Sequence, residues 1–247
     1  MDEASPQPQP PRRRSLVGAV ARALFEWAKS LSLAILLFLV VRAFLVEAYR
    51  IPSGSMEHTL LVGDFLLVNK LVYGAEIPFT SKRLPAVRQP RYRDVVVFKF
   101  PEDPTKNYVK RLVGLPGDTL AMRGGMLLRN GKVQDERRFV THIAPKSDAG
   151  GEEFDWQREF LVTRSALSAT YHPTRDNWGP IVVPAKHYFM LGDNRDDSED
   201  SRYWGFVADS LVLGSPIVVY YSYAHDSTAS LDWLTRVRWS RLGEVVR

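Results

Sequence analysis

The feature that most constrains this chain is a long apolar run near its N-terminus. Every residue from Ser30 to Val41 is apolar or serine, and after Arg42 the run resumes from Ala43 to Val46. As a helix, residues 29–49 extend about 30 Å, which is the hydrocarbon thickness of a bilayer. A buried core helix and a cleaved signal peptide are the alternatives, but no small-x-small cleavage site follows the run. We therefore predict a single transmembrane helix over residues 29–49.

The basic residues on either side of the apolar run predict its orientation. Five precede it and two follow within about twenty residues: Arg12, Arg13, Arg14, Arg22 and Lys29, then Arg50 and Lys70. Basic residues collect on the cytoplasmic side of a span. Residues 1–28 are therefore predicted to be a basic cytoplasmic tail, disordered where Pro, Gln and Arg dominate, and residues 50–247 to lie outside the cytoplasm.

The remainder of the chain has the pattern of a β-rich domain. Short apolar runs alternate with Gly, Pro and Asp, which is typical of strands and turns. Residues 129–176 are more polar and irregular, and are predicted to be a variable insertion or second subdomain. The tail from Leu231 to Val246 has helical periodicity and is expected to lie on a membrane surface. The predicted fold is thus mainly β: one N-terminal transmembrane helix and an all-β extracytoplasmic body. The strands are expected at 65–68, 95–100, 108–113, 126–128, 188–191 and 211–223.

Composition removes several classes of function. Without cysteine the chain has no disulfides, thiol nucleophiles or thiolate metal sites. Its five histidines are scattered and open no H-E-x-x-H zinc motif, and there is neither a G-x-S-x-G elbow nor a phosphate loop. The net charge of +5 resides largely in arginines at the two ends. Beside an apolar span, this indicates contacts with anionic lipid rather than nucleic acid.

The first segment of chemical interest is Ile51-Pro52-Ser53-Gly54-Ser55-Met56. Taken alone it is an ordinary turn, because Pro fixes φ and Gly permits unusual backbone angles. Its position gives it more weight. The chain from Tyr49 to Ser55 reaches at most about 20 Å, so chemistry at Ser55 takes place near the bilayer. A serine in a tight turn can also combine an exposed hydroxyl with the backbone N–H groups that an oxyanion needs.

The second segment is Tyr108-Val109-Lys110-Arg111-Leu112-Val113-Gly114-Leu115-Pro116-Gly117-Asp118, in which Lys110 lies within an apolar run. Lys110 either points to solvent from an edge strand or is buried. A buried lysine has a lowered pKa, and its neutral amine can then act as a base.

The third segment, residues 192–205, is a loop rich in carboxylates that contains Arg195 and Arg202. The carboxylates suggest calcium, but the loop lacks the ligand spacing of an EF-hand around a central glycine. Arginine–carboxylate pairs inside the loop are the alternative, and they would hold it rigid without a metal. We predict no metal site and no cofactor.

Taken together, the three segments resemble the type I signal peptidase family, membrane proteases that release exported proteins from their signal peptides. The motifs that carry the resemblance are P-S-G-S-M, K-R-L-V-G-L-P-G-D and G-D-N-R-D-x-S-x-D-S-R. The resemblance implies that Ser55 is the nucleophile and Lys110 the general base. It further implies that Ser198 orients the lysine amine and that Ser53 and Ser55 form the oxyanion hole. Asp193, Arg195, Asp200 and Arg202 are then structural supports of the site.

The family also implies a location, a substrate and points of departure. It implies the bacterial inner membrane, a periplasmic catalytic domain, and cleavage of preproteins after small residues in Ala-x-Ala-type sites. Three residues depart from the family's common pattern: His58 stands where proline is frequent, Asp197 replaces asparagine, and Arg93 replaces glycine. His58 is close to Ser55 in sequence, but we interpret it as a turn residue whose side chain points elsewhere. The oligomeric state is not predicted.

Two other functions fit parts of the sequence. A catalytically inactive, membrane-tethered β-domain would bind calcium or an export partner. A related peptidase that has lost its activity would serve as a scaffold in export. The presence of Ser55, Lys110 and Ser198 together favours the enzyme over both.

Overall fold

A computed structural model of the chain describes residues 16–78, 80, 82–143, 147–162, 170–224 and 232–247. The chain divides into two compact units, residues 1–42 and 43–247. Each is described by itself.

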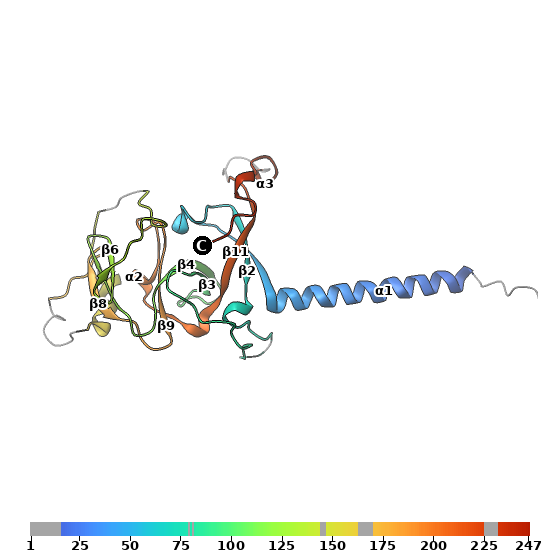
Figure 1. Ribbon diagram of the computed structural model, residues 1–247, viewed down its shortest axis with the longest axis horizontal. Helices are drawn as coiled ribbons and strands as arrows, with labels where there is room; N and C mark the ends of the chain where they lie inside the picture. Colours follow the sequence, from blue (N-terminus) through green and yellow to red (C-terminus); the bar gives the residue numbers. More distant parts are fainter. Residues whose placement is uncertain (1–15, 79, 81, 144–146, 163–169, 225–231) are drawn as a thin grey trace, which may run out of the picture. The chain divides into compact units, whose positions relative to one another are not determined.

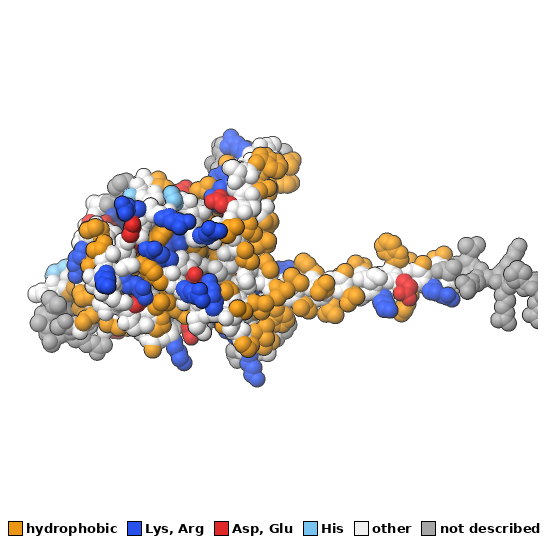
Figure 2. All heavy atoms as spheres, viewed as in Figure 1, with side chains coloured by type: hydrophobic (Ala, Val, Ile, Leu, Met, Phe, Trp, Pro, Cys, Tyr) orange, Lys and Arg blue, Asp and Glu red, His pale blue; other side chains and the backbone are white. Residues whose placement is uncertain are grey.

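The first unit is an apolar helix. Helix α1 (Leu16–Val40) continues into a π-helical turn, η1 (Val41–Leu45). Its large apolar side chains are exposed, as Figure 2 shows along the helix. Residues Val20–Leu45 form the one helix, among the described residues, that is long and apolar enough to cross a membrane.

The helix differs in its bounds from the predicted residues 29–49. It begins earlier, at Leu16, and its last five predicted residues belong to a strand, β1 (Val46–Arg50). The helix ends early because the next residues form a β-strand. Strand β1 pairs antiparallel with β2 (Asp64–Asn69), from Val46 opposite Asn69 to Arg50 opposite Phe65. Pairing of this kind satisfies the backbone groups that helix continuation would otherwise satisfy. The predicted tail over residues 1–28 is helical from Leu16, and its first fifteen residues lie outside the described part.

The second unit is built on a curled, seven-stranded antiparallel sheet with the order β1-β2-β11-β3-β4-β9-β10 (Figure 1). Strand β11, the last in the sequence, lies between two early strands, because it pairs with both β2 and β3. Its remaining strands are β3 (Val95–Lys99), β4 (Asn107–Gly114), β9 (His187–Leu191), β10 (Val207–Ala208) and β11 (Val212–Ser222).

A smaller sheet packs beside it, with the order β7-β6-β5-β8. Its strands are β5 (Thr119–Arg123), β6 (Met126–Arg129), β7 (Lys132–Val133) and β8 (Trp178–Val182). This sheet and the 3-10 helix η4 (Glu152–Phe160) contain the predicted insertion, residues 129–176, but the sheet begins earlier and ends later than that range.

Short helical turns complete the described part of the unit. They are η2 (Gly54–Met56), η3 (Leu71–Tyr73), α2 (Ser201–Trp204), η5 (Asp209–Leu211), α3 (Asp232–Thr235) and η6 (Trp239–Arg241).

Three apolar clusters pack against the curled sheet. Along β3, Val95 and Val97 pack into one cluster while Val96 and Phe98 pack into another, so both faces of this strand are covered. A strand buried on both faces appears as a continuous apolar run rather than an alternating one. The third cluster joins β4 and β9 to the smaller sheet around Trp178 and Phe189.

The six predicted strands and the mainly β fold are confirmed. The predicted helical periodicity of the tail from Leu231 to Val246 is wrong for its described residues. Helix α3 ends at Thr235, and later residues form β-bridges instead: Val237 with Tyr223, just after β11, and Val245 with Val218 of β11. The tryptophans and arginines there gave an apparent helical period, but pairing with β11 decides the conformation.

Candidate active site

The predicted nucleophile lies in the turn between β1 and β2. Ser55 is the middle residue of η2 and is 8% exposed. Its neighbours anchor the turn to the core, because Ile51, Met56 and Leu60 belong to an apolar cluster that also contains residues of β2 and β3. Proline and glycine set the turn, and the apolar residues hold it down, so the Ser55 hydroxyl has a fixed position.

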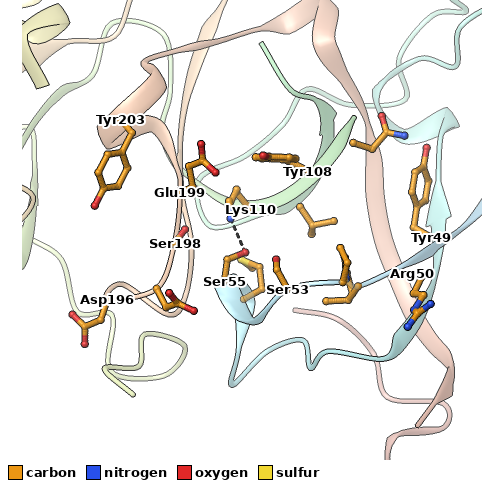
Figure 3. A pocket seen from close by; sticks show the side chains of 16 residues that line it. Tyr49, Arg50, Ser53, Ser55, Tyr108, Lys110, Asp196, Ser198, Glu199 and Tyr203 are labelled. Atoms are coloured by element: carbon orange, nitrogen blue, oxygen red, sulfur yellow. Dashed lines mark hydrogen bonds between the residues drawn. The ribbon is translucent and has the colours of Figure 1, made fainter. Parts of the chain in front are cut away.

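Lys110 comes from β4, which lies inside the sheet between β3 and β9. It is therefore not on an edge strand, and it is 4% exposed. Its amine nitrogen lies 2.6 Å from the Ser55 hydroxyl oxygen (Figure 3). Of the two interpretations open from the sequence, the structure supports the buried lysine.

Burial changes the acid–base chemistry of this amine. Removal from water lowers the pKa of Lys110 to about 8; the negative charges of Asp200, Glu199 and Asp193 oppose the shift, and the positive charge of Arg202 assists it. At pH 7 roughly a tenth of the molecules then carry the neutral amine, against fewer than about one in a thousand for an unperturbed lysine.

Asn194 and Gly192 hold the serine turn against the third segment. The Asn194 backbone N–H donates to the Ser55 carbonyl at 3.1 Å, and its side-chain amide donates to the Gly54 carbonyl at 3.3 Å. A Cβ at Gly192 would lie 2.1 Å from the Ser198 hydroxyl oxygen and 2.5 Å from the Ser55 carbonyl oxygen. Glycine is therefore required at 192 for close packing.

Ser53 and Ser198 lie on the walls of the same pocket (Figure 3). Ser53 is exposed, and its side chain does not cap the turn that follows. Ser198 is buried, and its hydroxyl oxygen has no hydrogen-bond partner in the described structure. A buried hydroxyl without a partner is costly, so a hydrogen bond from Ser198 to a further group in the pocket would be stabilising.

The carboxylates of the third segment are paired with arginines. Asp200 and Arg202, both fully buried, form a two-point ion pair at 2.8 and 2.9 Å, and Asp200 also accepts from the Gly192 N–H at 3.0 Å. Burial alone would raise the pKa of Asp200, but the Arg202 guanidinium and these hydrogen bonds keep that pKa below its usual value.

The other two support residues pair outside their own loop, contrary to the predicted internal pairs. Asp193 takes two bonds of 2.7 Å from Arg111 and one of 2.5 Å from Thr59, so it ties the lysine strand to the serine segment. Arg195 forms a two-point pair with Glu136 at 2.7 and 2.8 Å. The partners Arg111, Thr59 and Glu136 were not identified from the sequence, because a carboxylate–arginine pair leaves no local pattern.

No group of three or more His, Cys, Asp or Glu side chains within the described ranges is placed to hold a metal ion. The acidic loop instead places Asp196 beside basic side chains, near the His142 ring at 3.2 Å and near the Arg175 guanidinium at 3.7 Å.

Two departures from the family pattern adopt the left-handed backbone region. His58 has φ of 83° and Arg93 has φ of 74°. His58 is exposed and does not line the Ser55 pocket. It lines a second cavity, together with Arg93.

The pocket around Ser55 and Lys110 has a volume of about 620 Å³. Its lining combines apolar walls with a rim of polar groups. The apolar walls include Tyr49, Ile51, Met56, Val109 and Tyr203, and the rim includes Arg50, Asp197 and Glu199. It is large enough for several small side chains of a peptide.

Comparison of the sequence with known proteins identifies its family. Residues 24–221 match the family described as signal peptidase, peptidase S26. Signal peptidase I of Pseudomonas fluorescens is 38% identical over 232 residues, covering 87% of this chain and 78% of the relative. Signal peptidase I of Pseudomonas aeruginosa is 37% identical with the same coverage. The Aquifex aeolicus enzyme of that name is 33% identical, over 78% of this chain and 82% of the relative. The chain, a single apolar helix joined to a mainly β domain with a serine and a buried lysine in contact, belongs to the signal peptidase family, peptidase S26.

Proposed function

We propose that this protein is a membrane-bound serine endopeptidase that cleaves signal peptides from exported preproteins with a Ser55/Lys110 dyad. The observation that carries the proposal is the buried amine 2.6 Å from the Ser55 hydroxyl. A serine hydroxyl is a weak nucleophile until an adjacent base removes its proton. In this site the base is a lysine whose lowered pKa makes the neutral amine available.

The reaction follows from this pair. The neutral Lys110 amine takes the hydroxyl proton as Ser55 attacks the scissile carbonyl carbon. The resulting ammonium returns that proton to the leaving amine, and the C–N bond breaks to give an acyl-enzyme. Lys110 then takes a proton from a water molecule, which attacks the ester carbonyl. The ester C–O bond breaks, and the Lys110 ammonium returns the proton to the Ser55 oxygen.

Ser53 and the Ser55 backbone N–H are proposed as the oxyanion hole. Ser55 lies in the first turn of η2, where N–H groups have no partner within the helix. Ser53 adds a hydroxyl from the same wall of the pocket. Ser198 is proposed to orient the lysine amine, using the hydroxyl that has no other partner in the described structure.

The setting of the reaction is also proposed. The body is placed on the extracytoplasmic side of the bacterial inner membrane, with the N-terminus in the cytoplasm, because basic residues precede the span. Residues 1–28, 29–49 and 50–247 are the proposed cytoplasmic, membrane and catalytic segments, with the helix boundary adjusted to Leu45. The substrates are proposed to be preproteins with small residues before the cleaved bond, and anionic lipid is the proposed contact of the basic ends.

The test is cleavage of an exported precursor by purified protein in neutral detergent. Ser55→Ala should abolish the cleaved product, and Ser210→Ala, a change of an exposed serine outside the pocket, should leave the rate unchanged. Retained cleavage in a folded Ser55→Ala protein would reject the dyad. An inactive wild-type protein tested on several precursors would favour a scaffold instead.

A further inference from the structure

The second cavity, about 440 Å³ in volume, shares no lining residue with the Ser55 pocket. Its walls carry several basic groups and, among the lining side chains, one carboxylate. The basic residues are His58, Arg93, Arg111, Arg138 and Arg247, and the carboxylate is Glu244. Because consecutive side chains of a strand point to opposite faces, Arg111 faces away from the side that Lys110 occupies.

Two of the arginines are gathered on one aromatic ring. The Arg111 guanidinium lies 4.2 Å, and that of Arg93 5.4 Å, from the centre of the Phe139 ring. Phe139 is buried, so the ring is a fixed platform. Guanidinium groups that share one ring repel each other unless an anion balances them.

The anions already present balance only part of this charge. Asp193 neutralises Arg111, and Glu244 is paired with Arg241 at 2.6 Å. The main-chain oxygen of Arg247 also accepts from Arg111, at 3.4 Å. Arg93 donates to the main-chain carbonyl of Asp135 at 2.6 Å.

Arg138 is different, because it makes no hydrogen bond or ion pair with any residue that the structure describes. The cavity thus retains guanidinium donors that no carboxylate uses.

The backbone supplies an independent observation. Of the described non-glycine residues, four have positive φ: His58, Arg93, Asn130 and Lys186. Two of these four, far apart in sequence, line this cavity. Strained backbone of this kind persists where the surroundings hold it, and it concentrates at binding and catalytic sites.

We propose that this cavity is a binding site for a phosphate group. Guanidinium forks bind phosphate oxygens in two-point fashion, and Arg93 and Arg138 supply the unused donors. Inorganic phosphate and the phosphodiester of a lipid headgroup share this chemistry.

The test is calorimetric titration of the whole protein in neutral detergent with two probes, at ionic strength matched with sodium chloride. The probes are inorganic phosphate and a short-chain phosphatidylglycerol. Arg138→Ala should weaken binding about five- to tenfold. Arg137→Ala is the matched control: this exposed neighbour pairs with Asp135 and lies outside the cavity, so affinity should change less than about twofold.

Arg93→Gly separates binding from folding. Glycine tolerates φ of 74° without strain, which offsets the loss of the Arg93–Asp135 hydrogen bond, so the variant should melt close to the wild type while losing phosphate affinity. Binding of either probe that depends on both Arg93 and Arg138 supports the site, and the probe that binds identifies the source of the phosphate. Absence of saturable binding, or equal losses in the Arg137 and Arg138 variants, would overturn it.

Discussion

The contact between Lys110 and Ser55 brings the proposed general base to within 2.6 Å of the proposed nucleophile, and its consequences can be tested one residue at a time. With a pKa of about 8 for Lys110, kcat/KM should rise through this region as pH increases, well above the ~6.5 of a histidine. Lys110→Arg should be as inactive as Lys110→Ala, because a guanidinium keeps its proton. A pH–rate profile checks this, and His58→Ala should keep the same acid limb. An active, folded Lys110→Ala enzyme would remove the mechanism.

The same burial makes a prediction about stability. Burial lowers the pKa of Lys110 from 10.5 to about 8, so the protonated amine destabilises the fold below pH 8. The deficit is about 3–4 kcal/mol, at ~1.4 kcal/mol per pKa unit, and it disappears as pH rises towards 10.5. Lys110→Met should therefore be inactive yet more stable at pH 7, with the difference shrinking above pH 8. Urea unfolding at several pH values measures it, and a less stable variant at pH 7 would contradict it.

The hydroxyls on the pocket walls give a third prediction. If Ser53 stabilises the oxyanion, Ser53→Ala should lower kcat by about 10²- to 10³-fold and leave KM nearly unchanged, since the bond strengthens only in the transition state. Its melting temperature should not change, because the side chain is exposed and does not cap the turn. Steady-state kinetics and a melting profile distinguish this result from a folding defect. A loss confined to KM would assign Ser53 to substrate binding.

At the scale of elements, we expect the third segment to stabilise the strands that it contacts. Truncating one member of the fully buried Asp200–Arg202 pair leaves an uncompensated charge, and Asp200→Ala should destabilise the protein by about 3–5 kcal/mol. Replacing both with apolar residues should cost less than the sum of the single changes. Asp135→Ala, in the exposed Asp135–Arg137 pair, is the control and should leave the transition in place. If all these changes lowered the free energy of unfolding by equally small amounts, the Asp200–Arg202 pair would not be a stabilising element.

How far the sequence predicts these elements depends on what decides each one. Strand Val95–Lys99 was predicted because it begins with a continuous β-branched run, and Val212–Ser222 because residues 217–221 are β-branched or aromatic. Strand β1 was missed, since Val46–Arg50 continues an apolar helix and only pairing with β2 reveals it. Strand β8 was missed because Gly179 and Pro180 look like a turn. The tail after Thr235 was mistaken for a helix because, as for β1, only its pairing with another segment reveals its conformation.

The site was predicted unevenly for a related physical reason. Ser55, Lys110 and Ser198 were singled out through motif resemblance, whereas the residues alone favoured a solvent-facing Lys110. Its burial depends on β4 being an interior strand, which is a property of the whole sheet. The pairs Asp193–Arg111 and Arg195–Glu136 join residues 82 and 59 positions apart, and no local pattern encodes such a pairing.

At the scale of the whole molecule, the basic residues before the span predict the topology. Protease added to spheroplasts should degrade the body after Tyr49 and leave a short, protected N-terminal fragment. An antibody to the N-terminus detects the fragment, and lysed cells, in which it disappears, provide the control. Full protection of the body until lysis would reverse the orientation and with it the proposed access to exported precursors.

The immediate start of β1 after the apolar helix has a kinetic consequence. Ser55 lies ten positions after the helix end at Leu45, a path of at most about 35 Å, and the first five of those positions are fixed in strand β1. An active site tethered this closely to a membrane helix meets bilayer-bound precursors by lateral diffusion. The effective precursor concentration is then set by the lipid area rather than by the volume of the sample. Turnover in proteoliposomes should then follow the mole fraction of precursor in the bilayer: extra empty lipid in the same vesicles slows it, and extra buffer does not.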